Sequence, residues 1–157
     1  MSANRFAASP VADIVIDTNI VLDLLVFGDP ATIGLRERLE AGGLQWLVTA
    51  AMCDELARVL AYPKIAPRLT YYGQNAAGIL ERVASLSNTV PAAPKAGVTC
   101  KDADDQKFID LAVHHRALLL SKDRAVLCMA RRLQALGAVT RSAYDLPVSA
   151  ATPLAPA

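Results

Sequence analysis

The chain has 157 residues, of which 54% are hydrophobic and 20% charged, a composition that excludes a wholly disordered protein and suits one domain with one core. Its net charge of +1 excludes a polycation, so any contact with nucleic acid must come from a local patch. No apolar run approaches the roughly 20 residues that span a bilayer, and Pro10 and Asp13 interrupt the stretch where a signal peptide would carry its apolar segment.

The cysteine pattern argues against a disulfide framework and against a structural zinc site. Cys53, Cys100 and Cys128 are odd in number, far apart and free of CxxC spacing, and only two histidines accompany them. We therefore expect small buried or inert cysteines in a soluble, cytoplasmic protein that makes no contact with a membrane.

Strands and helices alternate along the chain in the hydrophobic pattern. Asp29 with Pro30, and Thr49, are typical helix starts, and Gly28, Gly42 and Gly137 are typical helix ends. In the first half of the chain we expect a strand at 14–16, helices at 20–27 and 30–42, a strand at 45–48 and a helix at 50–61. In the second half we expect two helical pieces within 64–87, a short strand at 89–90, a loop at 91–101, a helix at 104–116, a strand at 117–121, a helix at 124–136 and a short strand at 138–140. The apolar stripe of the helix at 30–42 would contain Ile33, Leu35 and Leu39, and that of the helix at 104–116 would contain Phe108, Leu111, Ala112 and His115.

This alternation predicts an α/β fold, a three-layer α/β/α sandwich with a short central parallel sheet. The domain would span residues 13–146, between a flexible N-terminus (1–12) and a disordered Ala/Pro-rich tail (147–157). Ligands of such sheets bind beyond the carboxyl ends of the strands, so the residues that follow each strand are the candidates for a site.

Acidic residues follow or approach these strand ends. Asp17 follows the first strand, Glu55 lies in the helix after the second, Asp105 starts the helix before the 117–121 strand, and Asp123 follows that strand. Clustered carboxylates repel one another, and the usual compensation is a divalent cation; oxygen ligands suit Mg²⁺ or Mn²⁺. Such an ion can activate water for phosphodiester hydrolysis.

Each acid also has an ordinary structural explanation. Asp17 and Asp123 could cap helices, Asp102 and Asp104 could be helix-start acids, and Glu55 could pair with Arg58 on the helix surface. Asp105 is harder to explain in this way, because it begins the stripe that faces the sheet. Their joint placement favours a shared site.

At these residues the chain resembles the PIN-domain nucleases over residues 13–145. The segment 14–19 is similar to that family's strand and Asp-Thr-Asn signature, the segment 49–60 to its second motif, and the segments 105–112 and 118–123 to its third and fourth. The stretch 101–105 is similar to one in the branch of toxins from toxin–antitoxin systems, although the Arg and Pro of that branch are replaced here.

The resemblance implies a Mg²⁺- or Mn²⁺-dependent endoribonuclease that cleaves RNA at a site made by Asp17, Glu55, Asp105 and Asp123, with Asp102 as a further ligand. Its toxin branch implies a possible cognate antitoxin. We also expect a homodimer. Thr18, Asn19 and Ser121 would orient the carboxylates. The apolar stretches 20–27 and 64–87 suit a homodimer interface, an antitoxin groove or core packing. Phosphates could meet five cations near the motifs: Arg58, Lys101, Lys107, Lys122 and Arg124.

Three other functions are compatible with an α/β chain that carries acids at strand ends. A haloacid-dehalogenase-type phosphotransferase needs a second Asp at the position of Asn19, so its second carboxylate is missing here. A receiver-like module needs an acid pair after the first strand, and this chain shows no clear pair there. A PIN-like domain that binds without catalysis is the closer rival, although the four acids argue against it. Tyr71 and Tyr72 could stack on bases, whereas Trp46, in a strand, suits the core.

Overall fold

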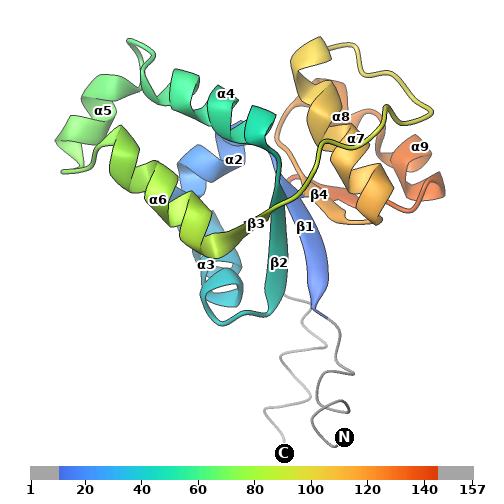
Figure 1. The fold of residues 1–157 in the computed structure, drawn as a ribbon, viewed down its shortest axis with the longest axis horizontal. Coiled ribbons are helices and arrows are strands. Elements are labelled where there is room, and N and C mark those ends of the chain that lie inside the picture. Colours follow the sequence, from blue (N-terminus) through green and yellow to red (C-terminus); the bar gives the residue numbers. More distant parts are fainter. Residues whose placement is uncertain (1–10, 145–157) are drawn as a thin grey trace, which may run out of the picture.

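A computed structural model describes residues 11–144 and contains a five-stranded, wholly parallel sheet in the order β3-β2-β1-β4-β5 (Figure 1). The strands are β1 (Ala12–Ile16), β2 (Leu44–Val48), β3 (Ser87–Thr89), β4 (Leu118–Leu120) and β5 (Thr140–Arg141). The chain builds the sheet outward from β1 to β3 and then crosses back to place β4 on the other side of β1. The strand order therefore switches between β1 and β4, and the crevice at the carboxyl ends of these strands is where such folds bind ligands.

Helices connect every pair of consecutive strands. Between β1 and β2 lie α2 (Thr18–Leu22), the π-helix η1 (Asp23–Phe27), the 3-10 helix η2 (Pro30–Thr32) and α3 (Ile33–Glu40). Between β2 and β3 lie α4 (Ala50–Leu60), α5 (Ala66–Tyr71) and α6 (Ala76–Leu86). The 3-10 helix η3 (Ala103–Asp105) and α7 (Gln106–His115) precede β4, and α8 (Arg124–Leu127) and α9 (Ala130–Ala135) precede β5.

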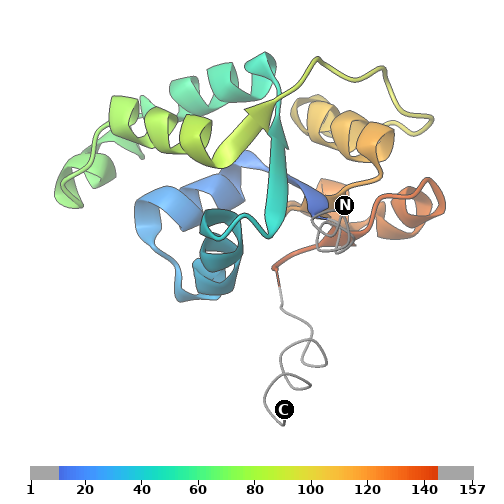
Figure 2. The ribbon, with the colours of Figure 1, turned by 60° about the horizontal axis from the view of Figure 1, so that its bottom comes forward.

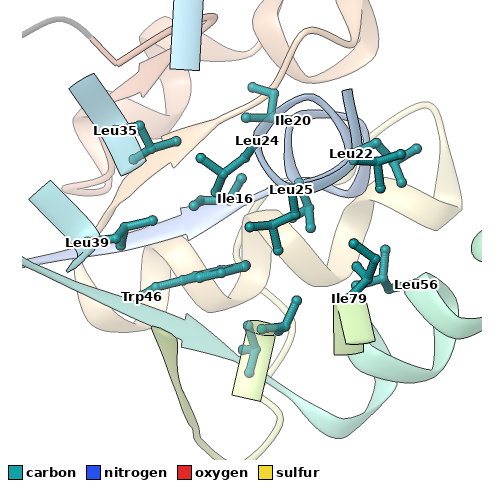
Figure 3. Packing of buried hydrophobic residues seen from close by; sticks show 14 of the residues in the cluster. Ile16, Ile20, Leu22, Leu24, Leu25, Leu35, Leu39, Trp46, Leu56 and Ile79 are labelled. Carbon is teal, nitrogen blue, oxygen red and sulfur yellow. The ribbon is translucent and has the colours of Figure 1, made fainter. Parts of the chain in front are cut away.

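Alternate residues of the central strands enter two separate cores, which explains why the strands are apolar at consecutive positions. Ile14 and Ile16 of β1 pack with Trp46 of β2 in one core, whereas Val15 packs with Leu47 in the other. The first core is covered by α2, η1, α3, α4, α5 and α6, and Figure 3 shows Trp46 beside Leu25 and Leu39 there. The second is covered mainly by α7, α8 and α9. These layers confirm the predicted α/β/α fold (Figures 1 and 2).

Two elements differ from the sequence-based prediction in how they continue. The helix expected at 20–27 changes from α to π at Asp23, and apolar periodicity cannot distinguish these two patterns of backbone bonding. The helix expected at 124–136 is broken between α8 and α9. Buried Val126, Met129 and Leu133 keep helical spacing across that break, so the pattern alone predicts one helix.

The predicted faces of two helices also need correction. Ile33 is 56% exposed rather than on the apolar stripe of α3, because residues two apart, such as Ile33 and Leu35, lie on different sides of a helix. His115 is only half-buried, in the last turn of α7. The last predicted strand, at 138–140, is observed at Thr140–Arg141, and the strand expected at 89–90 at Ser87–Thr89.

The remaining expectations concern segments at the ends of the chain, the cysteines and possible interfaces. The predicted tail (147–157) and all but two residues of the N-terminus (1–12) lie outside the described residues; Ala12 begins β1. Cys128 is exposed, whereas Cys53 is half-buried and Cys100 buried. The stretch 20–27 is largely core, and 64–87 contributes Leu69, Ile79 and Val83 to the core.

Among the described residues, no single helix is long and apolar enough to cross a membrane. One pair of helices, Thr18–Phe27 and Pro30–Glu40, reaches the required length and apolarity together, but it is bent by 105°.

Candidate metal centre

The candidate site lies where β1 and β4 end. Asp17 follows β1 directly, and its backbone N–H donates to the carbonyl oxygen of Leu120, at the end of β4, over 2.9 Å. Ser121 and Asp123 follow β4. The parallel register of these two strands therefore brings residues more than a hundred positions apart in the sequence to one point of the sheet edge.

A buried chain of hydrogen bonds joins Asp17 to Asp123. Asp17 is 3% exposed; its Oδ1 accepts from the backbone N–H of Ile20 at 3.0 Å, and its Oδ2 accepts from the Ser121 hydroxyl at 2.5 Å. The same hydroxyl oxygen accepts from the backbone N–H of Asp123 at 3.0 Å. Asp123 Oδ1 in turn accepts from the N–H of Ala125 at 2.8 Å. Asp17 and Asp123 thus both act as helix caps, and Ser121 links the carboxylate of Asp17 to the backbone N–H of Asp123.

Two further carboxylates, those of Asp102 and Asp105, converge on Asp123 at the end of this chain. Asp102, Asp105 and Asp123 each offer an oxygen atom, and these atoms lie within 4.8 Å of one another. Asp102 caps η3 through the N–H of Asp104, and Asp105 immediately precedes α7, whose buried Phe108 and Ile109 fix that helix against the sheet. Asp105 Oδ2 is buried and has no hydrogen-bond partner.

The electrostatics of the cluster are unfavourable without a cation. Burial, then the neighbouring carboxylate of Asp123, then the charges of Asp102 and Asp17 raise the pKa of Asp105 from 3.8 to about 7. Burial also raises the pKa of Asp17, despite the hydrogen bonds from Ser121 and Ile20, and the charge of Asp123 adds to the effect. A divalent cation would satisfy the unpartnered Asp105 oxygen and offset the repulsion, and an all-oxygen donor set suits Mg²⁺ or Mn²⁺ rather than zinc or copper. The residues present therefore fit such an ion.

The raised pKa of Asp105 makes the stabilising effect of a cation depend on pH. At Asp105 the folded protein without metal binds more protons than the unfolded chain between about pH 4 and pH 7, so the contribution of this group to stability falls as the pH rises through that range. The cation needs the ionised carboxylate and must displace the proton below pH 7. We expect the rise in Tm caused by saturating Mn²⁺ to be larger at pH 8 than at pH 5.5. Equal rises at both values, measured by scanning fluorimetry, would contradict this coupling.

Glu55 lies outside the cluster of three carboxylates. Its Oε2 accepts from the Thr18 hydroxyl at 2.6 Å, and its Oε1 forms an ion pair with Lys107 of α7. The pairing with Arg58 that the helix spacing allows is not the one observed among the described residues. Glu55 is nevertheless tied to the residue after Asp17 and to the helix that begins after Asp105, so it borders the site.

Two of the five cationic side chains predicted to contact phosphates form ion pairs with carboxylates of the protein. Lys107 pairs with Glu55, and Lys122 pairs with Asp23. Both partners are distant in sequence, so helical spacing gives no signal for either pair. Within residues 11–144, the other three cations, Arg58, Lys101 and Arg124, are exposed and form no salt bridge.

Asn19, which was predicted to orient a carboxylate, is exposed, and its side chain makes no hydrogen bond within the same residues.

Replacement of Ser121 tests the hydrogen-bond chain. Ser121 is fully buried, and Ser121→Ala removes the donor to Asp17 Oδ2 and the acceptor for the N–H of Asp123. Leaving such buried groups unpaired costs about 1–3 kcal/mol. We expect a loss of that size in the free energy of unfolding, measured by urea denaturation. Ser85→Ala, at an exposed hydroxyl of α6, is the matched control and should change the free energy little.

Comparison with known proteins agrees with the geometry. A family model described as PIN domain matches residues 13–125, well over half of the chain. That match extends from the start of the domain through β1, Glu55, Asp105 and Asp123. No curated protein matches the chain.

Proposed function

The chain belongs to the PIN domain family, and from that membership and the acidic cluster we propose that it is a Mg²⁺- or Mn²⁺-dependent endoribonuclease, which hydrolyses phosphodiester bonds. Metal-dependent nucleases are common in this family. The observation that carries the proposal concerns Asp105: its buried Oδ2 has no hydrogen-bond partner, and one of its carboxylate oxygens lies within 4.8 Å of oxygens of Asp102 and Asp123. An ordinary helix cap would not leave a carboxylate in that state, because burying it unpaired is costly.

Different side chains of the site would bind the ion and orient its ligands. Asp102, Asp105 and Asp123 would hold the ion, with Asp17 beside them. Once bound, Mg²⁺ or Mn²⁺ supplies a Lewis acid that activates water and offsets the charge that builds on a phosphate. Ser121 orients the carboxylates of Asp17 and the backbone of Asp123, and Thr18 orients Glu55. Because Lys107 neutralises Glu55, that pair adds no net charge at the edge of the site.

We extend the proposal to a biological role as the toxin of a toxin–antitoxin pair. Its support is the acidic stretch 101–105, which resembles that branch of the family and contributes Asp102 and Asp105 to the cluster. In this role the protein would be a cytoplasmic homodimer that binds a cognate antitoxin. The arrangement of neighbouring genes tests it, since a small adjacent gene with a DNA-binding N-terminus is expected.

The second candidate function is a PIN domain that binds RNA without cleaving it. The observation that favours it is the ion pair of Glu55 with Lys107, which takes one of the four predicted acids out of the cluster. The catalytic proposal does not require Glu55 as a ligand, because Asp102 provides the third carboxylate.

Cleavage of labelled RNA distinguishes the two functions. We expect the purified protein to cut single-stranded RNA in Mn²⁺ or Mg²⁺, to stop when EDTA is added, and to resume when excess Mn²⁺ is restored. Products should vanish in the Asp105→Asn variant, which excludes a contaminating nuclease. Retained RNA binding without any metal-dependent cleavage would establish the binding domain instead.

A further inference from the structure

An exposed group of aromatic residues surrounds α5, far from the acidic cluster. Tyr71 is 83% exposed, and its ring meets that of Tyr72 edge-on at 5.2 Å between centroids. Tyr72 lies 6.3 Å from Phe27, and the guanidinium of Arg68 lies 3.9 Å over the Phe27 ring. We call Phe27, Arg68, Tyr71 and Tyr72 the α5 platform. Figures 1 and 2 both place α5 at the opposite end of the molecule from α9.

The platform is fixed to the body of the protein. Leu69, between its members, is 4% exposed and belongs to the first core. Gln74, just after α5, donates from its side-chain amide to the carbonyl oxygen of Leu25 in η1 at 3.1 Å. Tyr71 therefore projects from an anchored helix, and the large exposure of its ring is not explained by fraying or by packing within residues 11–144.

The segment of chain that contains α5 carries charges of one sign. Residues 56–80 contain three cations (Arg58, Lys64 and Arg68), no acid, and three of the four tyrosines of the chain. All three cations are exposed, and none forms a salt bridge among the described residues. A symmetric contact between two copies through this surface would bring like charges together, so a second copy is a poor occupant. A polyanion with flat, apolar faces suits it: single-stranded nucleic acid combines phosphates with bases that stack on aromatic rings.

The surface also leads to the candidate site. Glu55 and Arg58 are one turn apart on α4, and Glu55 borders the acidic cluster through Thr18 and Lys107. In Figure 1, α4 runs from the edge of the sheet where β2 ends out to α5. Arg58 and the half-exposed Tyr62 therefore lie between Glu55 and α5 along the chain.

We propose that the α5 platform is an anchoring site for single-stranded RNA, on which unpaired bases outside the cleaved bond stack on Tyr71 and phosphates meet Arg58, Lys64 and Arg68. The proposal rests on RNA as the ligand of the proposed function but not on catalysis. It predicts that RNA binds without metal, since the platform holds none of the acidic residues.

Fluorescence anisotropy of a labelled 12-nucleotide oligouridylate, titrated with the full chain in EDTA, tests this site. We expect Tyr71→Ala to weaken binding about 5- to 100-fold, the range of a single base–aromatic stack, and Tyr71→Phe to bind as the unaltered chain does. Arg68→Ala should weaken binding and reduce the slope of log K against log salt by about 0.7, the value for one phosphate of a single strand. Arg131→Ala, at an exposed position of α9, is the matched control and should bind normally.

A duplex of the same length should bind more weakly and be insensitive to Tyr71→Ala, because paired bases cannot stack on the ring. Absent binding by the unaltered chain, or unchanged affinity in both Tyr71→Ala and Arg68→Ala, would overturn the proposal. So would a loss of dimer or of protein binding in these variants, seen by light scattering, with RNA affinity intact. If the protein cleaves RNA but its RNA binding does not depend on the α5 platform, only the proposal of an anchoring site is contradicted. If it binds RNA through the platform but does not cleave it, only the catalytic proposal is contradicted.

Discussion

Asp17→Asn is expected to reduce RNA cleavage at saturating Mn²⁺ by at least about 100-fold, equivalent to about 2.7 kcal/mol of lost transition-state stabilisation. The variant removes a negative charge from the end of β1, where Asp17 is buried and linked through Ser121 to Asp123. The fold should survive, because Asn is also a good helix N-cap and can still accept from the N–H of Ile20. Initial rates of cleavage, with circular dichroism of both proteins, measure the two halves of the prediction.

Asp13→Asn is the matched control for this change. Asp13 lies in β1, four residues before Asp17 and near the opposite end of the strand, where it pairs in register with Gln45. The same chemical substitution there should leave cleavage unchanged. Full activity of Asp17→Asn in Mn²⁺ would remove Asp17 from the site, and an equal loss in both variants would point to a general effect on the sheet.

Asp105→Asn is expected to stabilise the metal-free protein at pH 8 while abolishing the rise in Tm that Mn²⁺ produces. Partial burial, and then the neighbouring carboxylates of Asp123, Asp102 and Asp17, raise the pKa of Asp105 to about 7, so its ionised form opposes folding at pH 8. Since the group is partly solvated, we expect a gain of about 1 kcal/mol, or about 2–4 °C in Tm for a chain of this size. A bound ion stabilises the unaltered protein by mass action, and the variant lacks the ligand.

The control for Asp105→Asn is its neighbour. Asp104 is an exposed acid of the same helix start and is not one of the three clustered carboxylates. Asp104→Asn should therefore change neither the metal-free Tm nor the response to Mn²⁺, both measured by scanning fluorimetry at pH 8. A metal-free Tm that falls in Asp105→Asn, or a full response to Mn²⁺, would show that Asp105 is an ordinary structural acid.

The fold could be predicted closely because its signals are local. Consecutive apolar residues such as Ile14, Val15 and Ile16 enter two cores alternately, which only a sheet covered on both faces requires. Thr49 caps α4, and Gly28 ends η1 in a left-handed conformation with φ of +59°, as their residue types predict. The π-helix and the break after α8 could not be predicted, since both preserve the apolar spacing.

The candidate site could be predicted in part. A parallel sheet places the acids that follow its strands along one edge, and the pairing of β4 with β1 then brings Asp17 and Asp123 together. The ion pair of Glu55 with Lys107 depends on how α4 and α7 approach each other, which no pattern within either helix encodes. Whether Asp102 or Asp104 joins Asp105 was likewise open in the sequence; the 3-10 turn of η3 directs Asp102 toward the cluster.

The most direct test of the shared cation site is a crystal structure of the protein soaked in Mn²⁺, with anomalous data that locate the metal. Strong anomalous density between Asp105 and Asp123, within coordination distance of their carboxylate oxygens, is the expected result. The shared cation site would be contradicted if crystals saturated with Mn²⁺ showed no anomalous density at these residues, or showed the metal on another face of the protein.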